Sequence, residues 1–339
     1  MTGHKYGDTS LKYIQVDNQQ ALIFSQTDIP EIASDECLIK VKAIGVNRAD
    51  LLQRAGKYPA PVGESTILGL EVSGEISQCG KDVSKNHLGK NWQLGDKVFG
   101  LVAGGGYAEY VKVKAAQLFS LPANFTFEQG AACAEVFLTA YQSLFSIAKL
   151  KNNSNVLIHA GASGVGCAAI QLAKAKNCQV TVTVGSALKA QTCIELGAES
   201  AINYHETDFV SWSKENVAEG FDVIIDVISG DYVAKNINVA ALDGHVVMLA
   251  ILGGRFCDKL DVAKMLAKRL TLSASTLRNR SDSYKAELVA SFIAYFYQYL
   301  VEGKIKPIID SIYPWRDVEQ AHTKMANNEN IGKLVLVVS

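Results

Sequence analysis

The stretch VLIHAGASGVGCAAIQLAK (156–174) decides the fold of this chain. An apolar run typical of a β-strand passes into three closely spaced glycines, and a helix of small and apolar residues follows. Glycines let a backbone turn sharply and approach a pyrophosphate closely, and the start of a helix offers N–H groups and a positive dipole end. The spacing is G-x-x-G-x-G rather than G-x-G-x-x-G, but the strand-to-helix context is the one that dinucleotide binding requires. The alternative is a tight turn that binds nothing. The predicted contacts are Gly161, Ser163, Gly164, Val165 and Gly166.

The end of the next strand indicates which dinucleotide binds. A site for NAD usually places Asp or Glu there to hold the ribose 2′-hydroxyl. Here Gly185 and Ser186 stand at that place in TVTVGSALKAQ (181–191), and Lys189 follows one turn later. A carboxylate would repel a 2′-phosphate, whereas a small polar residue, a cation and the hydroxyl of Tyr204 would accept it. We therefore predict NADPH as the cofactor. The alternative for Lys189 is a solvated lysine on a helix.

Strands and helices alternate regularly through the middle of the chain. This pattern predicts a doubly wound parallel sheet, and the nearly all-apolar strands indicate helices on both of its faces. The predicted strands are 155–160, 179–184, 200–203, 221–227, 245–250 and 270–276.

The regions on either side follow different patterns. Shorter strands bounded by Gly, Asn and Asp come first and predict a partly open β-barrel, and a helical stretch over 127–150 follows them. The last sixty or so residues carry two helices and a strand, which we expect to return to the first domain. The early strands are 37–46, 71–79, 97–102 and 107–113, and the late elements are 281–302, 316–328 and 333–338. The predicted division is 1–130, 131–276 and 277–339, with the last segment rejoining the first.

Composition excludes several classes of function. The formal net charge is -1, so no overall basic field exists to hold nucleic acid or an anionic membrane. No apolar run approaches the length of a membrane span, and the start MTGHKYGDTS (1–10) has no apolar segment typical of a secretory signal. The seven cysteines are odd in number and scattered, which favours reduced thiols in a cytoplasmic protein over a disulfide framework.

Six segments, taken in order along the chain, resemble one family. They are NRADLLQRAGKYP (47–59), ILGLEVSG (67–74), LTAYQSL (138–144), AGASGVG (160–166), LDGHVVML (242–249) and NIGKLVLV (330–337). This pattern is similar to the zinc-free quinone oxidoreductases of the medium-chain dehydrogenase/reductase superfamily, with the p53-inducible type as the nearest. The resemblance implies a GroES-like β-barrel catalytic domain, an inserted Rossmann domain of the α/β class and a cleft between the two. It also implies a homodimer paired through the strand at 270–276.

The residues at the metal positions of related zinc enzymes argue against a metal here. Those positions hold Asn47, the run Gly69-Leu70-Glu71, and Glu135. Leucine cannot bind zinc, asparagine is a poor ligand, and one carboxylate alone does not make a site. The six histidines show no ligand spacing, so no metal is expected.

The resemblance also implies positions for the remaining site residues. Asn47 and Thr139 would lie near the nicotinamide, Asn47 with a donor able to polarise a carbonyl, and Tyr58 would line the substrate site. Cofactor contacts would also come from Val227, Leu252, Gly253, Leu277 and Lys333. The alternatives are a turn-capping amide for Asn47, a loop aromatic covering the barrel for Tyr58 and a solvated lysine for Lys333. A second glycine run, AGGG (103–106), is not followed by a helix and is predicted to be a turn.

For hydride transfer to a quinone, a protein has mainly to position the reactants and exclude water. This agrees with the absence of a convincing Ser-His-Asp or Cys-His arrangement. The predicted function is therefore an NADPH-dependent quinone reductase that acts on a small quinone or another electrophilic acceptor. Two alternatives stay open: an NADPH-dependent reductase of enones or 2-alkenals, and a non-catalytic NADPH-binding protein.

Overall fold

The computed structural model describes residues 10–83 and 85–339, and in it the chain divides into two units. Unit 1 runs to Glu135 and resumes at Arg278, and unit 2 is Val136–Leu277. The sequence predicts these boundaries after residues 130 and 276, slightly earlier than the structure has them. The observed first boundary falls within the predicted helical stretch at 127–150, which is therefore divided between the units. Residues 1–9, which carry most of the segment examined for a secretory signal, lie outside the described part of the chain.

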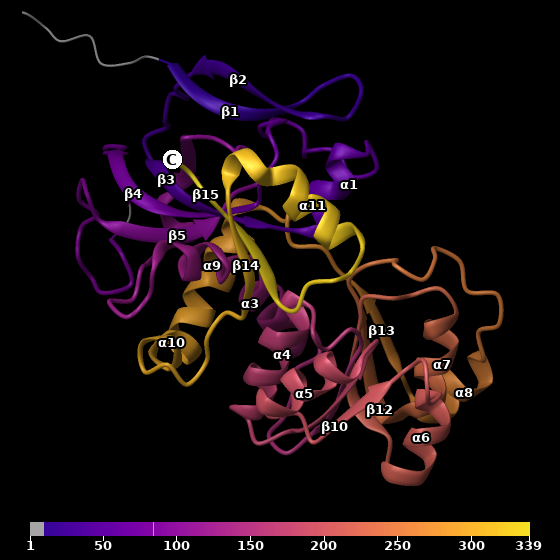
Figure 1. Cartoon of the computed structure of the whole chain (residues 1–339). Helices are drawn as coiled ribbons and strands as arrows, with labels where there is room; N and C mark the ends of the chain where they lie inside the picture. Colours follow the sequence, from indigo (N-terminus) through magenta and orange to yellow (C-terminus); the bar gives the residue numbers. More distant parts are fainter. Residues whose placement is uncertain (1–9, 84) are drawn as a thin grey trace, which may run out of the picture. The chain divides into compact units, whose positions relative to one another are not determined.

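Unit 1 is built on an open, strongly curved sheet (Figure 1). Its strands are β1 (Ser10–Val16), β2 (Leu22–Asp28), β3 (Glu36–Val46), β4 (Glu71–Cys79), β5 (Lys97–Leu101), β6 (Tyr110–Lys114), β7 (Leu118–Ser120), β14 (Ile309–Pro314) and β15 (Lys333–Val337). The main sheet has the order β14-β15-β3-β4-β5-β7, with β6 also paired to β3, and β1 and β2 form a separate hairpin. Strand β3 is central because β4, β6 and β15 all pair with it.

Strand β15 brings the end of the chain back to the first domain, as expected from the sequence. It lies antiparallel to β3, with Leu334 opposite Val46, and parallel to β14. The buried core beneath this sheet joins early residues such as Ile44 to late ones such as Trp315 and Leu336. The tail is therefore part of the first hydrophobic core and not an appendage.

The helices of unit 1 are short. They are α1 (Arg48–Arg54), η1 (Ala115–Gln117), α2 (Phe127–Ala131), α9 (Asp282–Phe292), η3 (Ile293–Tyr297), α10 (Gln298–Val301), η4 (Trp315–Asp317) and α11 (Val318–Ala326). The predicted helix at 281–302 is observed, but a π-helical segment, η3, interrupts it. The hairpin β1–β2 and strands β7 and β14 were not predicted.

Unit 2 contains the predicted parallel sheet. Its strands are β8 (Asn155–Ile158), β9 (Gln179–Val184), β10 (Ser200–Asn203), β11 (Phe221–Asp226), β12 (Ala240–Met248) and β13 (Thr271–Ala274), in the order β10-β9-β8-β11-β12-β13. Every neighbouring pair is parallel. The direction of the strand order reverses between β8 and β11, which is where doubly wound sheets bind ligands at their carboxyl edge.

Helices cover both faces of this sheet. They are α3 (Ala134–Tyr141), η2 (Gln142–Ile147), α4 (Gly164–Lys174), α5 (Ala187–Glu195), α6 (Phe209–Asn216), α7 (Asp231–Val239) and α8 (Val262–Lys268). Figure 1 shows α4 and α5 together on one side of the sheet and α6, α7 and α8 together on the other. No helix in the described part of either unit is long and apolar enough to cross a bilayer.

One glycine in unit 1 is fixed by both conformation and space. Gly69 has a φ of +100°, and a Cβ there would lie 2.7 Å from the Cα of Gly106 and from the backbone nitrogen of Tyr107. We expect Gly69→Ala to lower the free energy of unfolding by roughly 2–4 kcal/mol, because left-handed strain adds to overlap with backbone that cannot move aside. Urea denaturation followed by circular dichroism measures this loss.

Gly63 supplies the matched control. Its φ is +88°, and no atom lies within 4 Å of an added Cβ. Gly63→Ala should therefore cost only the conformational strain, about 1 kcal/mol. Equal losses for the two variants would show that packing around Gly69 adds nothing.

Candidate functional site

The glycine turn of unit 2 is shaped to receive an anion. Strand β8 ends at Ile158, α4 begins at Gly164, and the Ser163 hydroxyl caps the helix by accepting from the Gly166 amide at 3.0 Å. A Cβ on Gly166 would lie 2.4 Å from the carbonyl oxygen of Gly161, and a Cβ on Gly161 would lie 2.5 Å from the Val182 side chain. Both glycines are therefore required for the turn to close. The first-turn amides of Gly164 and Val165 have no acceptor inside the helix, which is the property that binds phosphate.

The residues predicted to bind a 2′-phosphate lie together at the carboxyl end of β9. Ser186 caps α5 by accepting from the Lys189 amide at 3.3 Å, so Lys189 belongs to the first turn of that helix. A Cβ on Gly185 would lie 2.4 Å from the Tyr204 hydroxyl oxygen. The Tyr204 backbone amide donates to the Val184 carbonyl, which fixes the tyrosine beside the end of β9. The hydroxyl of Tyr204 thus occupies the space that a side chain at position 185 would need.

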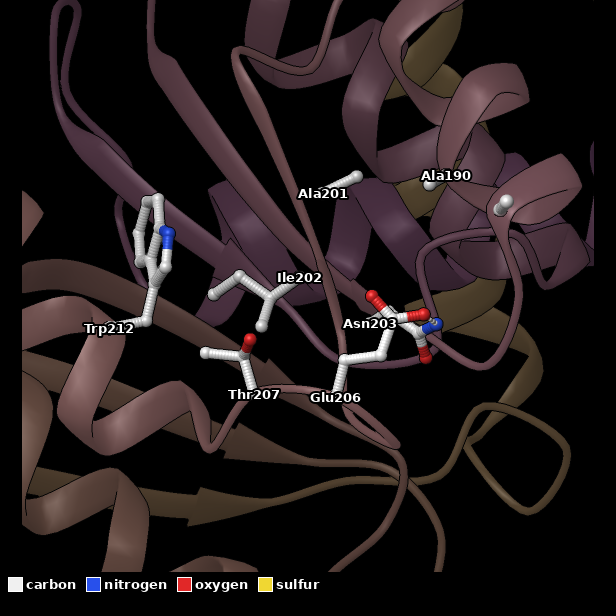
Figure 2. Close-up of a pocket in the computed structure, with 8 residues that line it drawn as sticks. Ala190, Ala201, Ile202, Asn203, Glu206, Thr207 and Trp212 are labelled. Carbon is white, nitrogen blue, oxygen red and sulfur yellow. Dashed lines mark hydrogen bonds between the residues drawn. The ribbon is translucent and has the colours of Figure 1, made fainter.

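A hollow of about 320 Å³ opens beside this cluster, between α5, β10 and α6 (Figure 2). Its lining is Ala187, Ala190, Ala201, Ile202, Asn203, Glu206, Thr207 and Trp212. It contains a carboxylate and no cation, and Glu206 accepts a hydrogen bond from the Asn203 amide. This chemistry does not suit a phosphate, so the hollow is distinct from the predicted 2′-phosphate position.

The loops after β11 and β12 are joined to each other. The Asp226 carboxylate accepts from the amides of Ile228 (2.7 Å) and Ser229 (2.9 Å), and the Ser229 hydroxyl donates to the Ala250 carbonyl at 2.6 Å. The Gly253 amide donates to the Ile228 carbonyl at 2.7 Å. The predicted contacts Val227, Leu252 and Gly253 are therefore brought together at one edge of the sheet.

A buried polar chain that was not predicted stiffens the same edge. His159, at the end of β8, contacts the Thr183 hydroxyl through Nδ1 (3.0 Å) and the Asn236 amide oxygen through Nε2 (2.7 Å). Asn236 in turn donates to Asp226 at 2.9 Å. Burial lowers the pKa of His159 although the nearby Asp226 charge raises it. A neutral ring with its proton on Nε2 satisfies every partner, as assigned from the network. Polar residues at the ends of otherwise apolar strands are the sequence signal for such a chain.

Unit 1 carries a buried ion pair, Lys333 with Glu71, beside the predicted site residue Asn47. The Lys333 ammonium, 3% exposed, lies 2.5 Å from the Glu71 carboxylate and donates to the Val46 carbonyl (2.7 Å) and to the Asn47 amide oxygen (2.6 Å). The Asn47 amide nitrogen donates to Glu71 (3.0 Å) and to the Gly45 carbonyl (3.2 Å). The second carboxylate oxygen of Glu71 accepts from the Glu135 amide at 2.9 Å.

These contacts change the roles expected for Asn47 and Lys333. Both amide hydrogens of Asn47 are already used, so the expectation of a free donor that polarises a carbonyl does not fit the structure. All three ammonium hydrogens of Lys333 have partners, and the alternative of a solvated lysine is wrong because the side chain is buried. A direct contact between Lys333 and a cofactor would break one of these bonds. The pair therefore acts by fixing the backbone around Asn47.

A second buried chain, also not predicted, holds the same backbone from the other side. The Asp50 carboxylate accepts from the amides of Asn47 (2.8 Å) and Gly69 (3.1 Å) and from the Tyr107 hydroxyl (3.3 Å). The Tyr107 hydroxyl also contacts His322 Nε2 at 2.9 Å. Burial raises the pKa of Asp50 to about 6 and lowers that of His322 to about 4. The sequence gives only weak signals of this chain. One is a carboxylate in the first turn of the helix that follows Asn47, and the other is a histidine in a helix near the end of the chain.

Tyr58 lies in unit 1 against an arginine that the sequence did not single out. The Arg278 guanidinium carbon lies 5.5 Å from the centre of the Tyr58 ring, and its Nε donates to the Ala103 carbonyl at 2.7 Å. Burial raises the pKa of the Tyr58 hydroxyl, and the Arg278 charge opposes that rise. Thr139 lies on α3 of unit 2, where its carbonyl accepts from the Ser143 hydroxyl, and the buried Leu277 ends that unit.

Family models match both units of the chain. Residues 33–123 match the alcohol dehydrogenase GroES-like domain, and residues 164–293 match the family described as zinc-binding dehydrogenase. The first match falls on the curved sheet of unit 1. The second begins within the glycine turn, at the start of α4, covers strands β9 to β13 of the parallel sheet and extends through α9 of unit 1.

Relatives extend the match to nearly the whole chain. A quinone oxidoreductase of Lama guanicoe is 31% identical over 317 residues, which cover 93% of this chain and 92% of the relative. The human synaptic vesicle membrane protein VAT-1 homolog is also 31% identical, over 325 residues that cover 91% of this chain and 80% of the relative.

Solved structures agree on the fold. A mycobacterial quinone oxidoreductase has a TM-score of 0.82 at 25% identity and covers 96% of this chain and 99% of its own. The CurK enoyl reductase has a TM-score of 0.84 at 24% identity, with 98% and 100% covered. This chain is an oxidoreductase of the kind that binds a nicotinamide dinucleotide, and it belongs to the quinone oxidoreductase-like family of the medium-chain dehydrogenase/reductase superfamily.

Proposed function

We propose that this protein is an NADPH-dependent quinone reductase that works without a metal ion. The name of the Lama guanicoe relative supports a quinone as the acceptor. The proposal of NADPH rests on Tyr204, whose hydroxyl lies against Gly185 and fills the place where an NAD-binding protein keeps a carboxylate.

The residues of unit 2 fit NADPH. The α4 N-terminus with Gly161, Ser163 and Gly166 would hold the pyrophosphate, and Ser186, Lys189 and Tyr204 would surround the 2′-phosphate. Thr139, Val227, Leu252, Gly253 and Leu277 remain proposed contacts for the rest of the cofactor. When bound, NADPH supplies a hydride from its nicotinamide ring.

The residues of unit 1 do not fit a zinc ion, despite the description of the matching family. Leu70 is apolar and buried, and the Asn47 amide is committed to Lys333, Glu71 and Gly45. Within residues 10–83 and 85–339, no group of three or more His, Cys, Asp or Glu is placed to hold a metal. The ammonium of Lys333 already supplies the positive charge that Glu71 requires. The proposed reaction therefore involves no metal.

A panel of acceptors tests the reaction. The purified protein should oxidise NADPH, followed by its absorbance, faster with ortho- and para-quinones than with enones or 2-alkenals, and a chelator should leave the rate unchanged. Faster reduction of enones or 2-alkenals would replace the quinone with an activated double bond as the acceptor. Tight NADPH binding without oxidation by any acceptor would instead indicate a non-catalytic binding protein.

Cofactor preference tests the 2′-phosphate position. We expect Lys189→Ala to lower the ratio of kcat/KM for NADPH to that for NADH by roughly 10- to 100-fold, as for loss of a charge-assisted hydrogen bond. Tyr204→Phe should lower it less, by roughly 3- to 10-fold, because a neutral hydroxyl is lost. Lys214→Ala on α6, an exposed helical lysine of the same unit, should leave the ratio unchanged. A wild-type protein with equal kcat/KM for the two cofactors would exclude the proposal.

We also propose that two copies pair through β13. This strand ends the parallel sheet, and among the residues that the structure describes β12 is its only strand neighbour, so its other edge offers unpaired backbone groups. Exposed apolar side chains lie in the segment leading to it: Ile251, Leu252, Phe256, Leu260, Val262 and Leu266. Sedimentation should give twice the 36.6 kDa mass of the chain. A monomer at micromolar concentration would exclude the pairing.

A cytoplasmic location belongs to the same proposal. All seven cysteines are unpaired, and five of them are buried. Thiols of this kind suit a reducing compartment.

A further inference from the structure

Arg278 is a buried cation with most of its donors unused. The residue is 6% exposed, and among the described residues only its Nε has a hydrogen-bond partner, the Ala103 carbonyl. Neither terminal nitrogen has a hydrogen-bond partner among the described residues. Buried guanidinium donors without acceptors are costly, and proteins rarely keep them unless something else completes the site.

The surroundings hold this guanidinium in one orientation. Ala103 begins the AGGG run, and a Cβ on the following Gly104 would lie 2.2 Å from the Ser65 carbonyl oxygen, so this run packs tightly. The Gly105 amide also donates to the Ile67 carbonyl at 2.8 Å. The Tyr58 ring lies beside the guanidinium at 5.5 Å. A rigid acceptor on Nε and an aromatic neighbour leave the two terminal nitrogens as a fixed fork.

The charges around the fork favour one kind of ligand. No ion pair within the described part of the chain includes Arg278, and burial lowers its pKa. The nearby carboxylates of Asp50, Glu135 and Glu64 act in the opposite direction. These acidic groups would oppose a multiply charged phosphate at the fork. They would tolerate a neutral molecule whose oxygen gains charge only during the reaction.

We propose that the two terminal nitrogens of Arg278 bind the carbonyl oxygens of the quinone and stabilise the negative charge that develops there. This inference rests on the proposed quinone reductase activity. In the proposed step, the C–H bond of the reduced nicotinamide would break, its hydrogen and electron pair would pass to one carbonyl oxygen of the quinone, and NADPH would become NADP⁺. The π electrons of the quinone would be displaced onto the other carbonyl oxygen, where a solvent proton completes the hydroquinone. The fork matches two adjacent oxygens, so ortho-quinones are the acceptors that it fits best.

Substitution of Arg278 tests the proposal. Arg278→Gln should lower kcat/KM for an ortho-quinone by about 100-fold or more, as for loss of an oxyanion donor. The dissociation constant of NADPH should change by less than about threefold, because the cofactor phosphates bind elsewhere. Arg278→Lys keeps the charge without the fork and should recover part of the rate. Arg280→Gln is the matched control, since Arg280 is exposed and also stacks on a tyrosine, Tyr284.

Chemical rescue separates a contact with the acceptor from a structural role. Added guanidinium should restore part of the activity of Arg278→Ala without changing its thermal stability. A loss that appears in NADPH affinity would assign the fork to a cofactor phosphate and overturn the proposal. Unchanged kinetics in Arg278→Gln would overturn it as well.

A binding measurement distinguishes failure of this inference from failure of the proposed function. Nitrocatechol, a coloured anion that resembles the reduced product, should bind the wild type and Arg280→Gln about tenfold or more tightly than Arg278→Gln. If the wild type oxidised no NADPH, the reductase assignment would fail, and this binding difference would still support the oxygen-binding fork. Equal binding by all three proteins would overturn the inference whatever the enzyme activity.

Discussion

The buried pair between Lys333 and Glu71 is the interaction on which unit 1 depends. Its two residues come from opposite ends of the chain, and the ammonium also binds the backbone at Val46 and the side chain of Asn47. Removing one partner of such a pair leaves an uncompensated charge in a dry interior, at a cost of about 3–5 kcal/mol. The pair therefore requires that β15 lie against β3 and that the turn after β3 keep one conformation. It joins the last strand of the chain to the first predicted site residue.

The two units obtain rigid strand ends by the same means. In unit 2, Thr183, His159 and Asp226 connect the ends of β9, β8 and β11, with Asn236 of α7 between the last two, and hold the loops that follow. In unit 1, Asp50 and Tyr107 hold the amide groups on both sides of the ion pair. The side chains named in each of these networks are buried and hydrogen-bonded, so few rearrangements are available within either unit without breaking a bond. The side chains proposed to bind the 2′-phosphate and the acceptor are not members of these networks.

Local patterns in the sequence were enough to predict the parallel sheet, the glycine turn and the cluster at Gly185, Ser186, Lys189 and Tyr204. These features depend on residues close in sequence or on successive strands. The true partners of Asn47 and Lys333 could not be predicted, because they are 286 residues apart and no local pattern reports on them. Arg278 was not singled out either, because only the folded chain shows that its terminal donors have no partner among the described residues. Strand β2 was missed because its side chains are mostly exposed and show little alternation. The sequence did not predict where the helical stretches at 127–150 and 281–302 are interrupted, because their apolar pattern continues through each interruption. The interruptions are a turn at Ala132–Cys133 and the π-helical segments η2 and η3.

The division of the chain also has a consequence for how the protein can diversify. Unit 2 is one uninterrupted segment, Val136–Leu277, whereas unit 1 is made of two pieces and contains both ends of the chain. Every residue proposed to discriminate the 2′-phosphate lies inside the uninterrupted segment, and Arg278, proposed to bind the oxygens of the acceptor, lies outside it. A genetic exchange with two crossover points could therefore replace the reductant preference while the recognition of the oxidant is inherited unchanged.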